Sequence, residues 1–98
     1  MTFGVVDPRT GDEFARAPEC SPTQLDAAFD AAAAAFASWR LDESARCAAM
    51  LAAADLIEAH TDELAALLAA ESGKPVAMAS GEVSISVAWL RYYGTVDV

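Results

Sequence analysis

The chain has 98 residues, 55% of them hydrophobic, and a formal net charge of −9. This length supports one small domain at most. Only six Lys and Arg residues face fifteen Asp and Glu residues, which argues against a surface that binds nucleic acid phosphates. No apolar run approaches the roughly 20 residues of a membrane span, and the first residues lack the basic and apolar segments of a secretory signal. We therefore expect a cytoplasmic protein without nucleic-acid or membrane partners.

The first predicted element is a β-hairpin over residues 3–17. Residues 7–11, Asp-Pro-Arg-Thr-Gly, form its turn. The Asp7 carboxylate can accept a hydrogen bond from the backbone two residues on, Pro8 presets φ, and Gly11 can adopt positive φ. Pro18 ends the return strand.

A helix is predicted over residues 21–39. Ser21 is the expected N-cap, Pro22 occupies the first helical position, and Gln24 completes a capping box. The run of alanines that follows has the highest helix propensity. The apolar residues of this helix fall on one stripe. The stripe comprises Leu25, Ala28, Phe29, Ala32, Phe36 and Trp39.

Two more helices are predicted over residues 42–60 and 61–73. Asp42 is the expected cap of the first and can form a weak ion pair with Arg46. Thr61 is the expected cap of the second, and Gly73 suits the left-handed position that ends a helix. The expected inward-facing residues are Cys47, Met50, Leu51, Ala54 and Ile57, followed by Leu64, Leu67 and Leu68.

The pattern of residues 76–93 is ambiguous on its own. Residues 83–89 alternate apolar and small side chains, which indicates a strand. A helix fits equally well and has two apolar stripes, with Glu82 and Arg91 as its only charges. The stripes are Val76, Val83, Val87 and Leu90 on one side, and Met78, Ile85, Trp89 and Tyr92 on the other. Such a helix requires cover on more than one side.

Few residues could carry chemistry. Cys20 and Cys47 match no disulfide framework or metal-ligand spacing, and both are expected to be small packed side chains. His60 lies at a helix junction, where a solvated or capping role is expected because a catalytic imidazole needs an orienting partner. Lys74 could meet a ligand anion, but its place near a helix C-terminus favours contact with the last carbonyls. We predict no catalytic, cofactor-binding or metal-binding residue.

Five motifs in order give the chain a resemblance to the N-terminal segment of the NAD(P)-dependent aldehyde dehydrogenase superfamily. They are VDPRTGD at residues 6–12, the helix pattern of residues 25–39, SAR with a following Leu at residues 44–51, ESGKP at residues 71–75, and EV with RYY at residues 82–93. The resemblance covers nearly the whole chain. In the family the stretch after the Gly-Lys-Pro turn is a helix, so it implies a helix over residues 76–93.

The resemblance therefore implies a mainly α unit with a short N-terminal β-hairpin, forming outer elements of an α/β, Rossmann-like coenzyme-binding domain. It implies a parent that oxidises an aldehyde to a carboxylic acid with NAD or NADP, the remainder of the chain as the partner of this segment, and a homo-oligomer when complete. The family's catalytic Cys, general-base Glu and oxyanion-stabilising Asn lie beyond these residues. Asp97 is offset by one residue from a cation-site pattern of some members, so that site is not carried over.

Two interpretations of the chain remain open at this point. In the first, it is a fragment of the dehydrogenase that places helices, binds no cofactor by itself and is inactive alone. In the second, it is a free-standing truncated helical module that docks on a partner or on a full-length homologue. The uncapped, apolar end of the sequence is what a truncated reading frame would give, and unpaired apolar faces on residues 29–39 and 83–90 would then be the docking surfaces.

Overall fold

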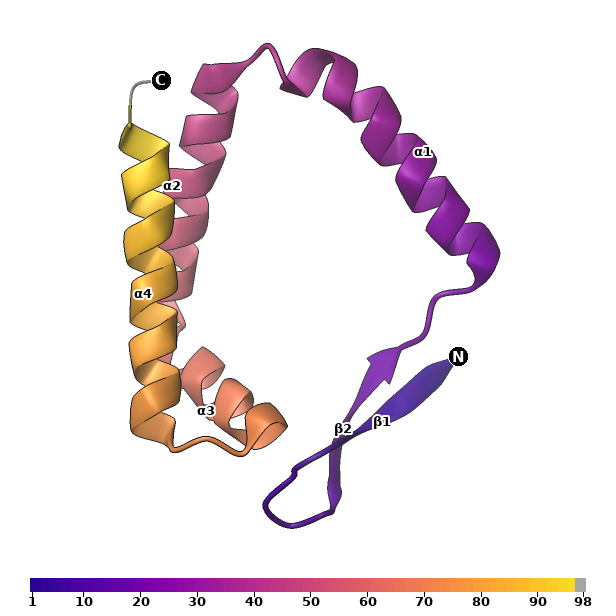
Figure 1. Cartoon of the computed structure of the whole chain (residues 1–98), viewed down its shortest axis with the longest axis vertical. Coiled ribbons are helices and arrows are strands. Elements are labelled where there is room, and N and C mark those ends of the chain that lie inside the picture. The colour runs from indigo at the N-terminus through magenta and orange to yellow at the C-terminus, as the bar shows by residue number, and fades with distance from the viewer. Residues whose placement is uncertain (97–98) are drawn as a thin grey trace.

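The computed structural model describes residues 1–96, which form a two-stranded hairpin followed by helices (Figure 1). Asp97 lies outside the described residues. The elements are β1 (Thr2–Val6), β2 (Glu13–Pro18), α1 (Pro22–Trp39), α2 (Glu43–Ala59), α3 (Thr61–Ser72) and α4 (Val76–Thr95). The mainly helical fold with an N-terminal hairpin is thereby confirmed, and the ambiguous last segment is a helix.

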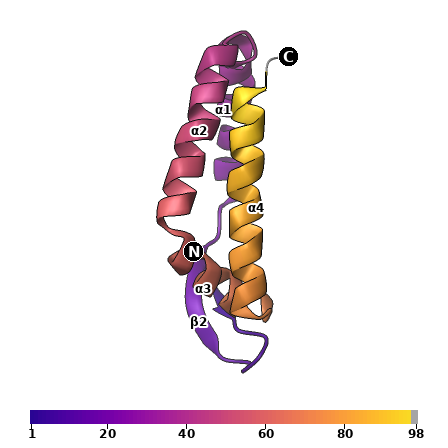
Figure 2. The same ribbon diagram turned by 90° about the vertical axis from the view of Figure 1, so that its left-hand side faces the viewer.

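The helical packing centres on α4. In Figures 1 and 2, α2 and α4 run side by side in opposite directions, and α3 crosses at the end where α4 begins. The buried side chains are small, which lets the helix backbones approach closely. They are Ala54 of α2, Ala65 and Ala69 of α3, and Ala79, Val83 and Val87 of α4. No large side chain among the described residues is fully buried, so the core is thin.

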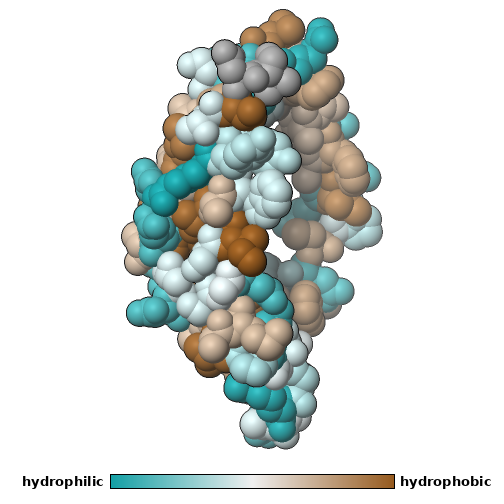
Figure 3. All heavy atoms as spheres, turned by 60° about the vertical axis from the view of Figure 1, so that its left-hand side comes forward, coloured by the Kyte–Doolittle hydropathy of each residue, from teal (hydrophilic) through white to brown (hydrophobic). Residues whose placement is uncertain are grey.

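The chain forms an open arc with two arms (Figure 1). One arm contains the hairpin and α1, and the other contains α2, α3 and α4. The molecule measures 47 × 36 × 18 Å and is thin in the edge-on view of Figure 2. Its radius of gyration is 17.1 Å, whereas a globular domain of 100 residues has about 13 Å. Figure 3 shows the space-filled molecule hollowed between the arms. Residues 1–96 therefore lack the closed packing of a self-contained domain.

Helix α1 departs most from the sequence expectation. Its apolar stripe does not join a core, because no residue of α1 is buried. Phe29 and Phe36 are among the most exposed large side chains of the molecule. The Ser21–Gln24 capping box is present, with both reciprocal hydrogen bonds. Local signals thus produce the helix, and none of its apolar side chains is buried by the rest of the described chain.

The caps of α2 and α3 show one agreement and two corrections. The Asp42 carboxylate accepts from the Ala45 amide, as predicted. The Arg46 guanidinium, however, donates to the Trp39 carbonyl rather than pairing with Asp42. Thr61 does not cap α3, because it is the first helical residue and its hydroxyl donates to the Glu58 carbonyl in the preceding turn.

The turn of the hairpin lies against the turn between α3 and α4. Asp7 is buried, and the Arg9 amide donates to its Oδ1 at 2.8 Å, which is the predicted turn contact. Gly73 has φ +73° and ends α3 in the left-handed conformation, as predicted. A side chain there would meet Pro8. The two turns named by the motif resemblance therefore touch each other.

Candidate functional site

The nucleophilic and basic side chains do not assemble into a reactive group. Cys20 is exposed, which corrects the expectation that it is packed, and Cys47 is half-buried on α2. His60 is exposed and its Nδ1 lies 3.2 Å from a Glu63 carboxylate oxygen. No group of three or more His, Cys, Asp and Glu residues within residues 1–96 could hold a metal ion. No helix of that range is long and apolar enough to cross a membrane.

Lys74 does not contact helix carbonyls, which corrects the prediction. Its ammonium forms an ion pair of 2.6 Å with the Glu82 carboxylate, which lies in the second turn of α4. The Lys74 side chain is three-quarters buried, so this pair fixes the start of α4 below the Gly73 turn. A charge used in this way is not free to bind a ligand anion.

Arg91 connects α4 to α2, a role that was not predicted from the sequence. Its guanidinium donates to both Glu58 oxygens, at 3.1 and 2.7 Å, and to Asp55 at 3.1 Å. Hydrogen bonding to Arg91, aided by its charge, lowers the pKa of Glu58, and the same contacts raise the pKa of Arg91. One feature of the sequence could have indicated an acidic partner for Arg91, namely the i, i+3 spacing of Asp55 and Glu58, which places both carboxylates on one helix face.

Arg9 forms an ion pair with Asp7 inside the hairpin turn. The guanidinium approaches the Asp7 carboxylate to 2.6 Å, and the backbone amide of Arg9 adds a further hydrogen bond. These hydrogen bonds, the side-chain one first, lower the pKa of Asp7. Because Arg9 also lies against the Gly73 turn, this pair stabilises the shape of the turn-to-turn contact.

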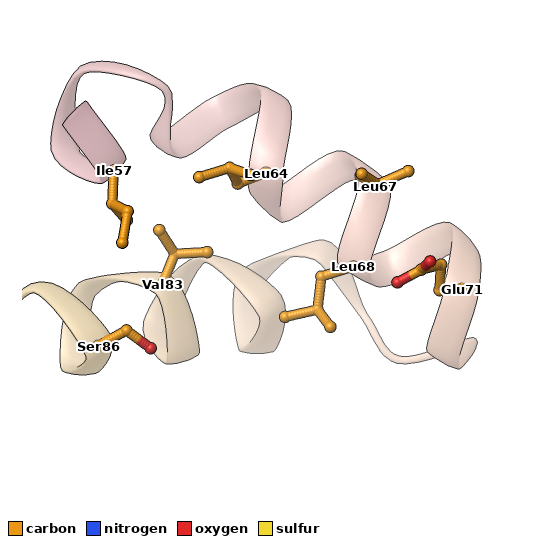
Figure 4. Close-up of a pocket in the computed structure, with 7 residues that line it drawn as sticks. All are labelled: Ile57, Leu64, Leu67, Leu68, Glu71, Val83 and Ser86. Atoms are coloured by element: carbon orange, nitrogen blue, oxygen red, sulfur yellow. The ribbon is translucent and has the colours of Figure 1, made fainter. Parts of the chain in front are cut away.

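An apolar hollow of about 320 Å³ lies where α3 meets α4. Its lining residues are Ile57, Leu64, Leu67, Leu68, Glu71, Val83 and Ser86. Figure 4 shows Ile57 and Val83 pointing toward one another, with Leu64 beside them. Leu67 is nearly half exposed at the rim rather than inward as predicted. The hollow has one carboxylate and no cation, so it cannot hold a phosphate group.

Comparisons with known proteins show which family the chain resembles. The model of the aldehyde dehydrogenase family matches residues 1–96. The non-phosphorylating aspartate-semialdehyde dehydrogenase of Halomonas elongata is 39% identical over 90 residues, which are 91% of this chain and 18% of that protein. The phenylacetaldehyde dehydrogenase of Pseudomonas fluorescens is 41% identical over 95 residues, which are 93% of this chain and 19% of that protein.

A mitochondrial relative shows the same relationship. The succinate-semialdehyde dehydrogenase of Rattus norvegicus is 36% identical over 93 residues, which are 94% of this chain and 18% of that protein. The chain therefore spans about a fifth of the length of the curated relatives it matches. Because the family model covers nearly every residue, the chain belongs to the aldehyde dehydrogenase family and corresponds to an N-terminal segment of it.

Proposed function

We propose that this chain is the structural N-terminal segment of an NAD(P)-dependent aldehyde dehydrogenase whose catalytic residues lie in the rest of the protein. The observation that carries the proposal is the family match over residues 1–96 in a chain about a fifth as long as its relatives. The complete enzyme would oxidise an aldehyde to a carboxylic acid, and we propose that it is a homo-oligomer. The segment would contribute packing and the placement of helices.

The described residues support a structural role, because none of them has the surroundings of a reactive group. A cysteine nucleophile requires a base or a cation that stabilises its thiolate. The backbone carbonyl of Cys47 lies close under Gly94, where α4 crosses α2, and Cys20 lies between the hairpin and α1. Neither thiol forms a hydrogen bond or an ion pair within residues 1–96, whereas His60 pairs with Glu63.

We expect these residues to bind no dinucleotide cofactor. A diphosphate is bound by helix N-termini with a glycine-rich loop or by free cations. Within residues 1–96, four of the six basic side chains form ion pairs with carboxylates: Arg9, Arg16, Lys74 and Arg91. Arg46 donates to the Trp39 carbonyl, and Arg40 lies over the Phe36 ring. The apolar hollow beside α3 carries Glu71, which repels phosphate. We therefore place the nicotinamide cofactor on the part of the enzyme beyond this chain.

The direct test measures NAD(P)+ reduction by the purified 98-residue chain with a panel of aldehydes. We expect no turnover above buffer. As a matched positive sample, residues 1–96 are grafted in place of the homologous segment of the Halomonas elongata relative, and the graft is expected to retain activity. Turnover by the isolated chain, or a graft that neither folds nor turns over, would contradict the proposal.

The exposed stripe of α1 supports a second candidate, a free-standing module that docks on a partner. Leu25, Phe29 and Phe36 are each more than half exposed. Size-exclusion chromatography with light scattering separates the candidates when it is combined with binding of an apolar dye. A monodisperse monomer that binds no dye contradicts the module, whereas capture of a full-length homologue by the isolated chain supports it.

A further inference from the structure

Helix α4 is apolar on two opposite faces. One face is buried against α2 and α3 through Ala79, Val83 and Val87. At 3.6 residues per turn, a second set lies on the other side of the helix. This outer face consists of Met78, Ile85, Trp89 and Tyr92, and each of these side chains is more than half exposed. A helix that is apolar on opposite sides is characteristic of a protein interior with a layer on each side.

The outer face carries a cluster of aromatic rings that contact one another. The rings of Trp89 and Tyr93 stack with centroids 5.7 Å apart. Tyr92 meets Trp89 edge-on at 6.2 Å and Tyr93 edge-on at 5.1 Å. Trp and Tyr are enriched among the residues that contribute most binding energy in protein interfaces, and rings that already contact one another lose less conformational entropy on binding. The cluster therefore has the properties of an interface anchor.

The net charge of the chain and the length of its relatives indicate what covers the outer face of α4. A second copy of the chain also carries a net charge of −9, which opposes self-association. About four-fifths of each relative's chain has no counterpart here, and a segment of that length is long enough to supply a layer over this face. The span from Met78 to Tyr92 is about 21 Å along the helix axis, at 1.5 Å per residue. Figure 3 shows hydrophobic side chains reaching the surface on the α2–α4 side of the molecule.

We propose that the outer face of α4 is the docking surface for the remainder of an aldehyde dehydrogenase chain, with Trp89 and Tyr92 as its anchors. The inference rests on the proposed function and makes it more specific. It states that α4 is an interior helix between two layers, of which α2 and α3 form one. The second layer must be apolar over the length from Met78 to Tyr92.

Cysteine labelling in the active graft tests this surface. Both native cysteines are first replaced (Cys20→Ser and Cys47→Ser), and then Ile85→Cys is introduced on the outer face. The matched control is Leu41→Cys, because Leu41 is exposed between α1 and α2 and lies off the outer face. The rate of maleimide labelling is measured by mass spectrometry in the isolated chain, in the graft, and in the graft unfolded by urea.

We expect labelling of the Ile85→Cys graft to be at least about tenfold slower than that of the isolated chain and to recover in urea. Fast labelling in a graft that still oxidises aldehyde would overturn the docking surface and leave the proposed function standing. If labelling of the isolated chain is slow and becomes slower as the protein concentration rises, a second copy of the chain covers the face. That result would also overturn the proposed docking surface.

A second measurement applies if the graft does not fold. The isolated chain and the remainder of the Halomonas elongata relative are co-expressed as two pieces and purified through a tag on the remainder. We expect co-purification, and we expect Trp89→Ala with Tyr92→Ala to reduce it at least about tenfold, whereas Leu41→Ala leaves it unchanged. Co-purification that is indifferent to the double substitution would overturn the proposed anchors, and no co-purification would overturn both proposals.

Discussion

Gly73 lies directly against Pro8, so that a β-carbon built at Gly73 would stand 2.9 Å from the Pro8 Cγ atom. The contact joins the turn of the hairpin to the turn that ends α3, although the two residues are 65 positions apart. Gly73 also has a φ of +73°, which non-glycine residues rarely adopt. Both the backbone conformation and the neighbour therefore require glycine at this position.

We expect Gly73→Ala to destabilise the chain more than Gly11→Ala does. Gly11 has a similar φ of +81° but nothing within 4 Å of an added β-carbon, so its substitution isolates the backbone cost. That cost is about 1–2 kcal/mol, and Gly73→Ala adds the clash with the rigid Pro8 ring. Urea unfolding followed by circular dichroism measures both. Equal losses in the two variants would show that the turns do not touch in solution.

The two glycines of α4 are expected to respond to alanine in opposite directions. At Gly94 an added β-carbon would lie 2.9 Å from the Leu51 Cδ2 atom and 3.3 Å from the Cys47 carbonyl oxygen. Gly94→Ala should therefore cost about 1–3 kcal/mol through overpacking. At Gly81 an added β-carbon meets nothing, so Gly81→Ala should stabilise the helix by about 0.5–1 kcal/mol.

The melting temperatures of the two variants check this pair. Gly81→Ala is the control for helix propensity, because it changes the same residue type in the same helix without a contact. A Gly94→Ala variant that gains stability as Gly81→Ala does would contradict the close crossing of α2 and α4.

The Arg91 ion pairs predict a loss of stability in acid. The folded chain lowers the pKa of Glu58 below its unfolded value of about 4.3 through the Arg91 hydrogen bonds. Stability from this pair is therefore fully present above the unfolded pKa and is lost as the pH falls through the folded pKa. Asp7 behaves in the same direction because of Arg9. We expect the urea midpoint to fall as the pH is lowered from 6 to 3.

Arg91→Met separates the two contributions, because it keeps the aliphatic stem and removes the charge. The variant should lose stability at neutral pH and show a shallower decline in acid, with the residual decline coming from Asp7. Arg16→Met is the control, because Arg16 pairs with Glu13 within the hairpin and joins no helices. An unchanged pH profile in Arg91→Met would mean that the link between α2 and α4 is not formed in solution.

Local signals in the sequence predicted the elements well, whereas contacts between elements were harder to foresee. The Ser21 cap and the Gly73 stop depend on residues within one turn of each other, and a sequence shows such neighbours directly. The Arg91 contact to Glu58 spans 33 positions, and the Lys74 pair with Glu82 depends on how the turn between α3 and α4 is folded. Charge spacing alone does not fix such geometry.

The exposure of α1 had a different cause. Its apolar stripe predicts a buried helix, and burial needs a partner surface that residues 1–96 do not provide. The ambiguity of residues 76–93 had the same origin. A helix with two apolar faces resembles an alternating strand in its pattern, because residues on opposite faces follow each other closely along the chain. Both departures are consistent with a segment that shares its core with a larger protein.

Helix α1 is therefore expected to be the least protected helix of the isolated chain. With no buried residue, its stability depends on alanine propensity and the Ser21 capping box, and such a helix frays readily in water. Hydrogen–deuterium exchange should show α1 amides exchanging faster than those of α2 and α4. Ser21→Ala should speed exchange in α1 further and leave exchange in α4 unchanged. The increase in rate should correspond to a loss of about 1 kcal/mol of capping free energy.

In the graft with the Halomonas elongata relative, α1 should become as protected as α4, because the larger protein then covers its apolar stripe. Fast exchange of α1 in an active graft would show that the stripe stays uncovered in the complete enzyme.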